Sequence, residues 1–362
     1  MPRTARSVPR VPPHLAAKAA TIHRRAIVID AMAGSLTYPP VPPIDGHSYL
    51  DLIAEGGVTG YNAILVSQPT YNATLRDTLR AFNENYRFLE AYRDRVVEVS
   101  TAADIERAKR QGRLAVIFGT ESSTMLEDDP GLVAILHRLG MRIMQLTYNE
   151  RNLLGDGCLE KTDLGLTNFG SQVVREMQRV GIVVDLAHAS PKTCLDAIEV
   201  ARLPVIVSHA NARAIWPNPR NLTDDVLKAV AGTEGVIGAT PYAPFCQTKP
   251  AVPATIEDFF IHLDYLVKVV GLEHVGIGTD YFENKDPVTW RTANRYPQVA
   301  GGHTIDSRRA VGFARASDFP RVTEGLVARG WSEADIRKVL GENFLRIFRK
   351  CWRAEGKSNY EL

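Results

Sequence analysis

The sequence predicts an α/β fold, a (β/α)8 TIM-like barrel followed by extra C-terminal helices. Three observations predict it. About eight short β-branched apolar runs recur along the 362 residues, amphipathic stretches with helical spacing lie between them, and His, Glu or Asp follows several runs. Near-continuous Val, Ile and Leu content is typical of parallel strands that are buried on both faces. Eight such units favour a closed barrel over an open sheet, which usually stops at about six strands.

The elements are expected in alternating order. The expected strands span residues 26–30, 61–66, 114–118, 143–147, 181–186, 204–208, 235–240 and 274–278. The expected helices between them include residues 74–96, 168–180, 191–202, 224–231 and 256–270. Residues 318–354 predict two or three packing helices, whose apolar face includes Asn343, Phe344, Leu345, Ile347 and Phe348. Two loops, the Pro-rich 41–46 and the longer 281–304, are long enough to shape a pocket.

These elements suggest a simple domain organisation. We expect a basic N-terminal arm with a helix near its end over residues 1–25, one metal-dependent hydrolase-type barrel domain over residues 26–354 and a tail over residues 355–362. The arm is rich in proline and has no apolar core, which excludes an ordinary secretory signal.

Composition narrows the class of protein. A net charge of +2 is spread along the chain, so a small-molecule substrate is expected and a nucleic-acid partner is not. No run reaches the roughly 18 apolar residues that a membrane span needs. The four cysteines are widely spaced, which argues against a zinc ribbon or a disulfide scaffold and predicts reduced thiols. Together these features suggest a cytoplasmic enzyme.

Metal-binding residue types follow four of the expected strands. Glu121 follows AVIFGT, His188 follows IVVDLA, His209 follows PVIVS, and Asp280 follows HVGIGT. Loops at the carboxyl ends of barrel strands converge on one pocket, so these side chains should meet. Neutral imidazole suits zinc, and a carboxylate can bind metal or accept a proton. A single strand-end histidine is more often structural, and Asp280 could equally be a helix N-cap.

The chain resembles a known family. The segments LTYNERN, GLTNFG, VVDLAHAS, SHANARA, PRNLTDD, HVGIGTD and GENFLRIF are similar, in order and spacing, to the membrane (renal) dipeptidase family of zinc metallopeptidases, which belongs to the amidohydrolase-like barrels. The resemblance covers residues 27–348. It implies a binuclear zinc enzyme that cleaves dipeptides, including some with a D-residue on the carboxyl side, with some members opening β-lactam-type rings.

The resemblance also implies roles for individual residues. Glu121 corresponds to the carboxylate that bridges two metals, and His188 and His209 correspond to ligands of the second metal. Asp280 matches the acidic residue that handles the proton of water. Arg220, in PRNLTDD, matches an arginine that holds the terminal carboxylate of the substrate, a task that suits a planar guanidinium.

The sequence departs from the family at the first metal. The first strand of the family ends in Asp-Gly-His-x-Asp, whereas this chain reads DAMAG over residues 30–34, so Met32 and Gly34 replace both first-metal ligands. Thioether sulfur is a poor substitute for imidazole on zinc, and glycine has no side chain. The segment DGHSY, at residues 45–49, is a weak candidate for a relocated ligand pair. Tyr148 replaces a histidine that stabilises the oxyanion, and tyrosine can still donate a hydrogen bond.

Three hypotheses remain open. The leading one is a hydrolase that holds one zinc ion through Glu121, His188 and His209, with Asp280 accepting the proton of water and Tyr148 contacting a dipeptide or related amide. A second is a hydrolase of a non-peptide amide, lactone or ester. A third is a non-catalytic descendant that binds a ligand in the same pocket. Related enzymes are commonly dimers, so a homodimer is one assembly open to the chain.

Overall fold

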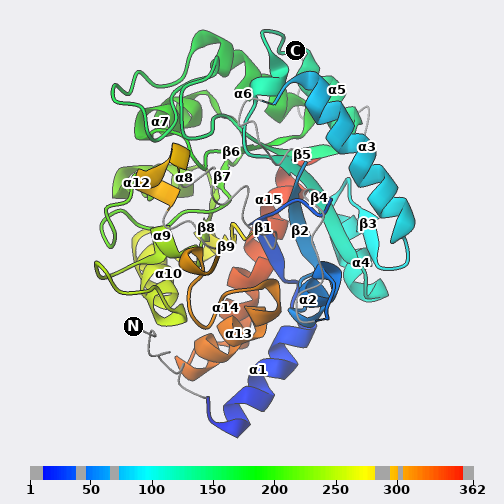
Figure 1. Ribbon diagram of the computed structural model, residues 1–362, viewed down its shortest axis with the longest axis vertical. Helices are drawn as coiled ribbons and strands as arrows, with labels where there is room; N and C mark the ends of the chain where they lie inside the picture. Colours follow the sequence, from blue (N-terminus) through cyan, green and yellow to red (C-terminus); the bar gives the residue numbers. More distant parts are fainter. Residues whose placement is uncertain (1–10, 38–45, 66–72, 282–293, 301–304, 354–362) are drawn as a thin grey trace.

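The protein is described from a computed structural model that covers residues 11–37, 46–65, 73–281, 294–300 and 305–353. Eight parallel strands form a barrel, and helices surround it (Figure 1). The strands of the sheet are β1 (Ile29–Ala33), β2 (Gly60–Ile64), β3 (Val96–Glu98), β4 (Leu114–Thr120), β5 (Met141–Gln145), β6 (Val183–Asp185), β7 (Ile206–Val207), β8 (Val236–Ala239) and β9 (Val275–Ile277). This arrangement confirms the predicted (β/α)8 barrel.

The barrel closes between its first and last strands. The strand order is β1-β2-β4-β5-β6-β7-β8-β9, with every pair parallel. Beyond β9, Tyr281 forms a parallel bridge with Ala33, and the Asp280 amide donates to the Met32 carbonyl at 2.9 Å. The carboxyl end of the chain's last barrel strand therefore lies beside the carboxyl end of its first.

Helices cover the outside of the barrel. They are α1 (Pro13–Arg25), α2 (Tyr49–Glu55), α3 (Leu75–Ala91), α4 (Ala102–Gln111), α5 (Leu132–Arg138), α6 (Asn168–Val180), α7 (Pro191–Val200), α8 (Asp224–Gly232), α9 (Ala243–Cys246), α10 (Ile256–Val270), α12 (Pro297–Ala300), α13 (Phe319–Ala328), α14 (Glu333–Arg337) and α15 (Asn343–Cys351). Helices α6 and α10 have the predicted bounds. In α10, Thr255 and Asp258 form a capping box, which satisfies amides at the helix start.

One predicted helix is too long, and one strand was not predicted. We expected a helix over residues 74–96, but α3 ends at Ala91 and Val96 begins β3. The neighbouring β4 explains the change, because Leu114 donates its amide to the Arg95 carbonyl at 2.8 Å and Val96 pairs with Leu114. β3 has only three residues, too few for a recognisable strand pattern.

The two ends of the barrel differ. At the end where the strands begin, the apolar interior residues Ile29, Ile143 and Val183 form one core cluster with Phe344 and Phe348 of α15. Asn343 of α15 also donates to the Val275 carbonyl at 2.8 Å. Helix α15 therefore covers this end, and polar site residues gather at the other.

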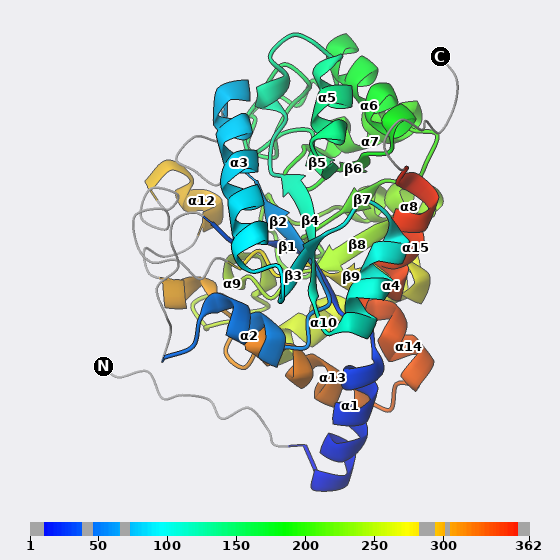
Figure 2. The same ribbon diagram turned by 90° about the vertical axis from the view of Figure 1, so that its right-hand side faces the viewer.

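The N-terminal helix packs on the same body. Helix α1 lies beside α13 in both views (Figures 1 and 2), and the buried His23 of α1 lies 2.7 Å from Thr323 Oγ1 of α13.

The division of the chain at residues 25 and 354 stays a prediction. The two long loops expected to shape a pocket lie largely outside the described residues. Among the described residues, no helix has the length and apolar character needed to cross a bilayer. The four cysteines are free thiols, and Cys158 is the only one of the four that is not fully buried.

Candidate metal centre

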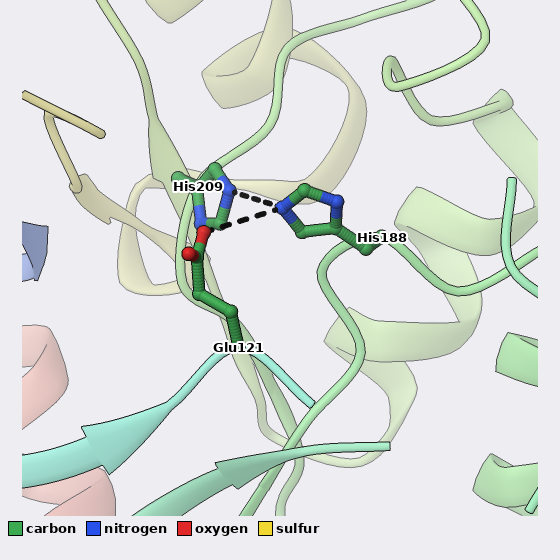
Figure 3. A group of neighbouring side chains, drawn as sticks. All are labelled: Glu121, His188 and His209. Carbon is green, nitrogen blue, oxygen red and sulfur yellow. Dashed lines mark hydrogen bonds and ion pairs between the residues drawn. The ribbon is translucent and has the colours of Figure 1, made fainter. Parts of the chain in front are cut away.

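Three predicted ligands converge at the carboxyl end of the barrel. Glu121 directly follows β4, and His188 and His209 lie shortly after β6 and β7 (Figure 3). His188 Nε2 lies 3.1 Å from His209 Nε2 and 3.6 Å from Glu121 Oε1. One donor atom from each residue lies within 4.8 Å of the other two. Three strands that are neighbours or near neighbours in the barrel thus bring together the set that sequence reasoning predicted.

The hydrogen bonds of the His188 and His209 imidazole rings indicate which ring nitrogen carries the proton. Arg220 Nη2 lies 2.6 Å from His209 Nε2, and a guanidinium can only donate, so this Nε2 is an acceptor. The proton of His209 is therefore on Nδ1, which donates to Ser208 Oγ at 2.9 Å. His188 Nδ1 donates to Asn149 Oδ1 at 2.7 Å. Both neutral rings consequently turn an Nε2 lone pair toward the same space.

This donor set fits a zinc ion. Two imidazole nitrogens and one carboxylate oxygen face one another with no proton between the two nitrogens. The Arg220 guanidinium, which donates to His209 Nε2, relieves part of the repulsion among these lone pairs, and a metal cation would relieve it further. Zinc is bound by these atom types, and three protein ligands leave a position for water or substrate in catalytic zinc sites. The chemistry of Glu121, His188 and His209 therefore fits a single catalytic metal.

Burial controls the ionisation of the site. Burial, and secondarily the Arg220 charge, lowers the pKa of His188 and His209 well below 6.5, so both rings are neutral at pH 7. Burial and then the nearby Asp280 carboxylate raise the pKa of Glu121 well above its usual value, while Arg220 opposes them. A bound divalent cation would favour the charged form of this carboxylate.

Asp280 and Arg220 lie beside the same histidine. Asp280 Oδ2 is 4.0 Å from His209 Nε2, and burial raises the pKa of Asp280 to about 7, with Arg220 and then Arg308 opposing the shift. Arg220 is buried, and its guanidinium lies over the Phe245 ring at 5.0 Å. Asp280 is therefore placed for proton transfer, and Arg220 places a buried positive charge at the site.

Tyr148 lies on the other histidine. Its ring stacks on His188 with 4.1 Å between ring centroids, and it also lies 5.8 Å from the Tyr296 ring. Tyr148 is only partly buried, whereas His188 is buried. All six residues that sequence reasoning selected are thus joined in one network of contacts at this end of the barrel.

Two of these residues have unusual backbone geometry. His188 has φ = 67° and Asp280 has φ = 56°, a left-handed region that side chains other than glycine, Asn and Asp rarely adopt. For a histidine this conformation is costly, and such strain tends to persist at functional sites. The chain turns sharply as it leaves β6, and the turn directs the His188 ring toward His209.

The first-metal position lacks a ligand cluster. Met32 is buried, and its amide lies 3.4 Å from Asp30 Oδ1. The Asp30 carboxylate is held by Thr279, which donates from its amide at 2.8 Å and from its hydroxyl at 2.7 Å. His47 forms an exposed ion pair with Glu55 at 2.8 Å. Among the described residues, only Glu121, His188 and His209 form a potential metal-binding group.

Three supporting residues were missed from the sequence. Asn149 and Ser208 set the ring protons, and both lie next to residues already selected in LTYN and SHAN. Asp185 ends β6, and its Oδ1 accepts from the amides of Ala187 at 3.0 Å and Ser208 at 2.9 Å. Adjacency in the motifs could have suggested the first two. The role of Asp185 depends on the pairing of β6 with β7.

Known proteins are similar to this chain in sequence. The model of the membrane dipeptidase family, peptidase family M19, matches residues 43–302 and 299–360. Dipeptidase tcpJ of Claviceps purpurea (strain 20.1) is 30% identical over 325 residues, which cover 86% of this chain and 71% of that relative.

Solved structures are also similar to this chain. An amidohydrolase from Pseudomonas aeruginosa has a TM-score of 0.81 and 31% identity, covering 92% of this chain and 99% of its own. A metallo peptidase from Rhodobacter sphaeroides, liganded with a phosphinate mimic of a dipeptide, has a TM-score of 0.75 at 22% identity and covers 91% of this chain and 100% of its own, which supports the fold. The chain therefore belongs to the membrane dipeptidase family of metallopeptidases, peptidase family M19, and is a metal-dependent, dipeptidase-like hydrolase.

Proposed function

We propose that this hydrolase cleaves a dipeptide, or a closely related small amide, with one zinc ion held by Glu121, His188 and His209. The observation that carries the proposal is the pair of Nε2 lone pairs, 3.1 Å apart, that face a carboxylate oxygen. The single-metal form is supported by Met32 and Gly34, which offer no imidazole or carboxylate where the family places its first-metal ligands.

The remaining residues divide the chemistry. Zinc, when bound, supplies a positive charge that lowers the pKa of water and polarises a carbonyl group. Asp280 accepts the proton of the attacking water and returns it to the leaving amine, a task suited to a carboxyl whose pKa lies near neutrality. Arg220 pairs with the terminal carboxylate of the substrate. Tyr148 donates a hydrogen bond to the oxygen that gains negative charge.

Zinc content and turnover test the proposal together. Elemental analysis of protein purified without chelator should give about one zinc per chain, as expected for three protein ligands and one open position. His188→Ala should lose the zinc and the turnover. Asp280→Asn should keep the zinc but lower kcat on dipeptides by at least about 10²-fold, because it removes the general base.

His47→Ala is the matched control, since His47 is an exposed histidine paired with Glu55. It should change neither zinc content nor turnover. Loss of zinc in His47→Ala, or about two zinc ions per chain, would overturn the single-metal proposal. Faster turnover of activated esters or lactones than of any dipeptide would assign the same site to a non-peptide substrate. No turnover of any amide or ester by zinc-loaded protein would refute the catalytic role.

A further inference from the structure

A second cavity lies at the opposite end of the barrel from the metal centre. It has a volume of about 350 Å³ and is bordered by the end of α1, by α2, by the segment before β3 and by the end of α4. Thr59 and Leu114, where β2 and β4 begin, form part of its wall. These elements lie around the lower part of the barrel in Figure 2. The cavity is therefore separate from the site at the carboxyl ends of the strands.

The wall of this cavity is strongly basic. Arg24, Arg95, Lys109 and Arg113 line it, and Asp94 is the one acidic residue among the lining side chains. Four positive charges around one small cavity repel one another; Lys109 and Arg113 are partly buried, which screens them less than the exposed Arg24 and Arg95. The cavity therefore has a net preference for negative charge.

Two of the four cations are already engaged. Arg95 pairs with Asp51 at 2.7 Å. Arg113 donates through Nη2 to the carbonyls of Arg93 and Val96, each at 2.6 Å. These contacts fix the positions of both guanidinium groups, so they form a preorganised part of the wall.

The other two cations have no partner. Within the part of the chain that the structure describes, neither Arg24 nor Lys109 has an ion pair or a side-chain hydrogen bond. Lys109 is half-buried, and burial lowers its pKa. The end of α4 does not need the ammonium group either, since the amides of Gly112 and Arg113 already bind its last carbonyls.

We propose that this cavity binds a small anion that carries a phosphate group. The anion would pair with Arg24 and Lys109, which have no ion pair among the described residues, and a guanidinium can hold a phosphate through two parallel hydrogen bonds. Leu50, Ile53 and Val58 give the cavity an apolar side. This side suits the organic part of a phosphate monoester. A ligand bound here would stabilise the folded protein by mass action, without contact with the metal centre.

Calorimetric titration with inorganic phosphate tests the site, at constant ionic strength maintained with chloride. We expect millimolar affinity in the wild type and a loss of about tenfold or more in Lys109→Gln and in Arg24→Gln, since charge-assisted hydrogen bonds to phosphate are lost. Lys268→Gln, on the exposed face of α10, is the matched control and should bind as the wild type does. Dipeptide turnover without phosphate should be unchanged in all three variants.

A fourth variant distinguishes phosphate binding in this cavity from phosphate binding at the metal centre. Phosphate could also bind at the metal centre, and His209→Ala removes that route. Retained phosphate binding in His209→Ala together with its loss in Lys109→Gln supports the proposal. Binding that survives in Lys109→Gln but disappears in His209→Ala overturns it, as does an absence of binding at millimolar phosphate in the wild type. Because this readout is binding, it stands whether or not the proposed dipeptidase activity is found.

Discussion

The metal centre depends first on where two protons lie. Asn149 accepts from His188 Nδ1, and Ser208 accepts from His209 Nδ1, which leaves both Nε2 atoms without a proton. A histidine ligand that loses such a partner can adopt the other tautomer or rotate, and metal affinity falls. Metal affinity should therefore depend on Asn149 and Ser208, which accept these protons, as well as on the two histidines.

Asn149→Leu tests this argument. The substitution keeps a similar volume but removes the acceptor for His188 Nδ1, so zinc affinity should fall by about 10- to 100-fold. Asn149→Asp restores an acceptor at the same place and should recover most of the affinity. Competition with a chromogenic chelator measures both. Equal losses in the two variants would show that packing, not the hydrogen bond, explains the effect.

The contact of Arg220 with His209 allows its effects on zinc binding and on substrate binding to be tested separately. Its guanidinium donates to His209 Nε2, the same atom that faces the metal position, so arginine and metal compete for one lone pair. Arg220→Gln should therefore not weaken zinc binding. It should raise KM for dipeptides by about 10-fold or more, because a bidentate, charge-assisted contact with the substrate carboxylate is lost.

A substrate pair provides the control for Arg220. For a dipeptide amide, which lacks the terminal carboxylate, KM should be nearly the same in the wild type and in Arg220→Gln. Steady-state kinetics on both substrates, with zinc content measured in parallel, make the comparison. A similar rise in KM for the acid and the amide would contradict carboxylate recognition by this arginine.

At the scale of elements, one carboxylate ties two strand ends together. Asp185 Oδ1 accepts from the amide before His188 and from the amide before His209. β6 and β7 have only three and two residues, so few ladder hydrogen bonds hold their ends in place. The Asp185 contacts supply part of what those short strands lack, and they fix both histidines relative to each other.

Asp185→Ala should loosen both ligands at once. We expect a fall of at least about tenfold in zinc affinity and a loss of about 1–3 kcal/mol in the free energy of unfolding, since two buried amides lose their acceptor. Asp185→Asn keeps an oxygen acceptor and should lie close to the wild type in both. Chelator competition and urea unfolding give the two values. A normal zinc affinity in Asp185→Ala would rule out a positioning role.

The elements also show how far sequence reasoning reaches. The barrel and the ligand set followed from strand-end residues, because parallel strands place their carboxyl ends at one face. β3 could not be predicted, since its three residues form a strand only by pairing with Leu114, Ala115 and Val116 of β4. Asn149 and Ser208 lie next to residues that the motifs selected, so adjacency could have suggested them. Asp185 could not be assigned a role, because one of its partners, the Ser208 amide, lies beyond the neighbouring strand β7. Periodicity identifies elements, whereas these contacts depend on how the elements are packed together.

In the whole molecule, an apolar cluster and the candidate metal site lie at opposite ends of the barrel. Helix α15 covers one end with Phe344 and Phe348, and the candidate metal ligands lie at the other. The end with the candidate metal site holds a strained turn at His188, whose left-handed backbone conformation costs free energy.

Acid sensitivity is a property of the whole molecule that a single residue can test. His262 of α10 is buried, donates from Nε2 to the Gln247 carbonyl at 3.2 Å, and has no partner at Nδ1 among the described residues. Burial is the main cause that lowers its pKa from 6.5 to about 4. Between these values the unfolded chain binds a proton that the folded protein does not, so stability is lost as the pH falls. The loss attributable to His262 reaches at most about 3 kcal/mol at pH 4.

His262→Gln removes this titration and keeps a side-chain donor for Gln247. Its free energy of unfolding should fall less steeply than that of the wild type between pH 6.5 and pH 4, as measured by urea unfolding at several pH values. Zinc release at low pH affects both proteins, so it cancels in their difference. Parallel curves for wild type and His262→Gln would mean that acid stability is set elsewhere, with the buried His137, whose pKa burial lowers to about 4, as the next residue to change.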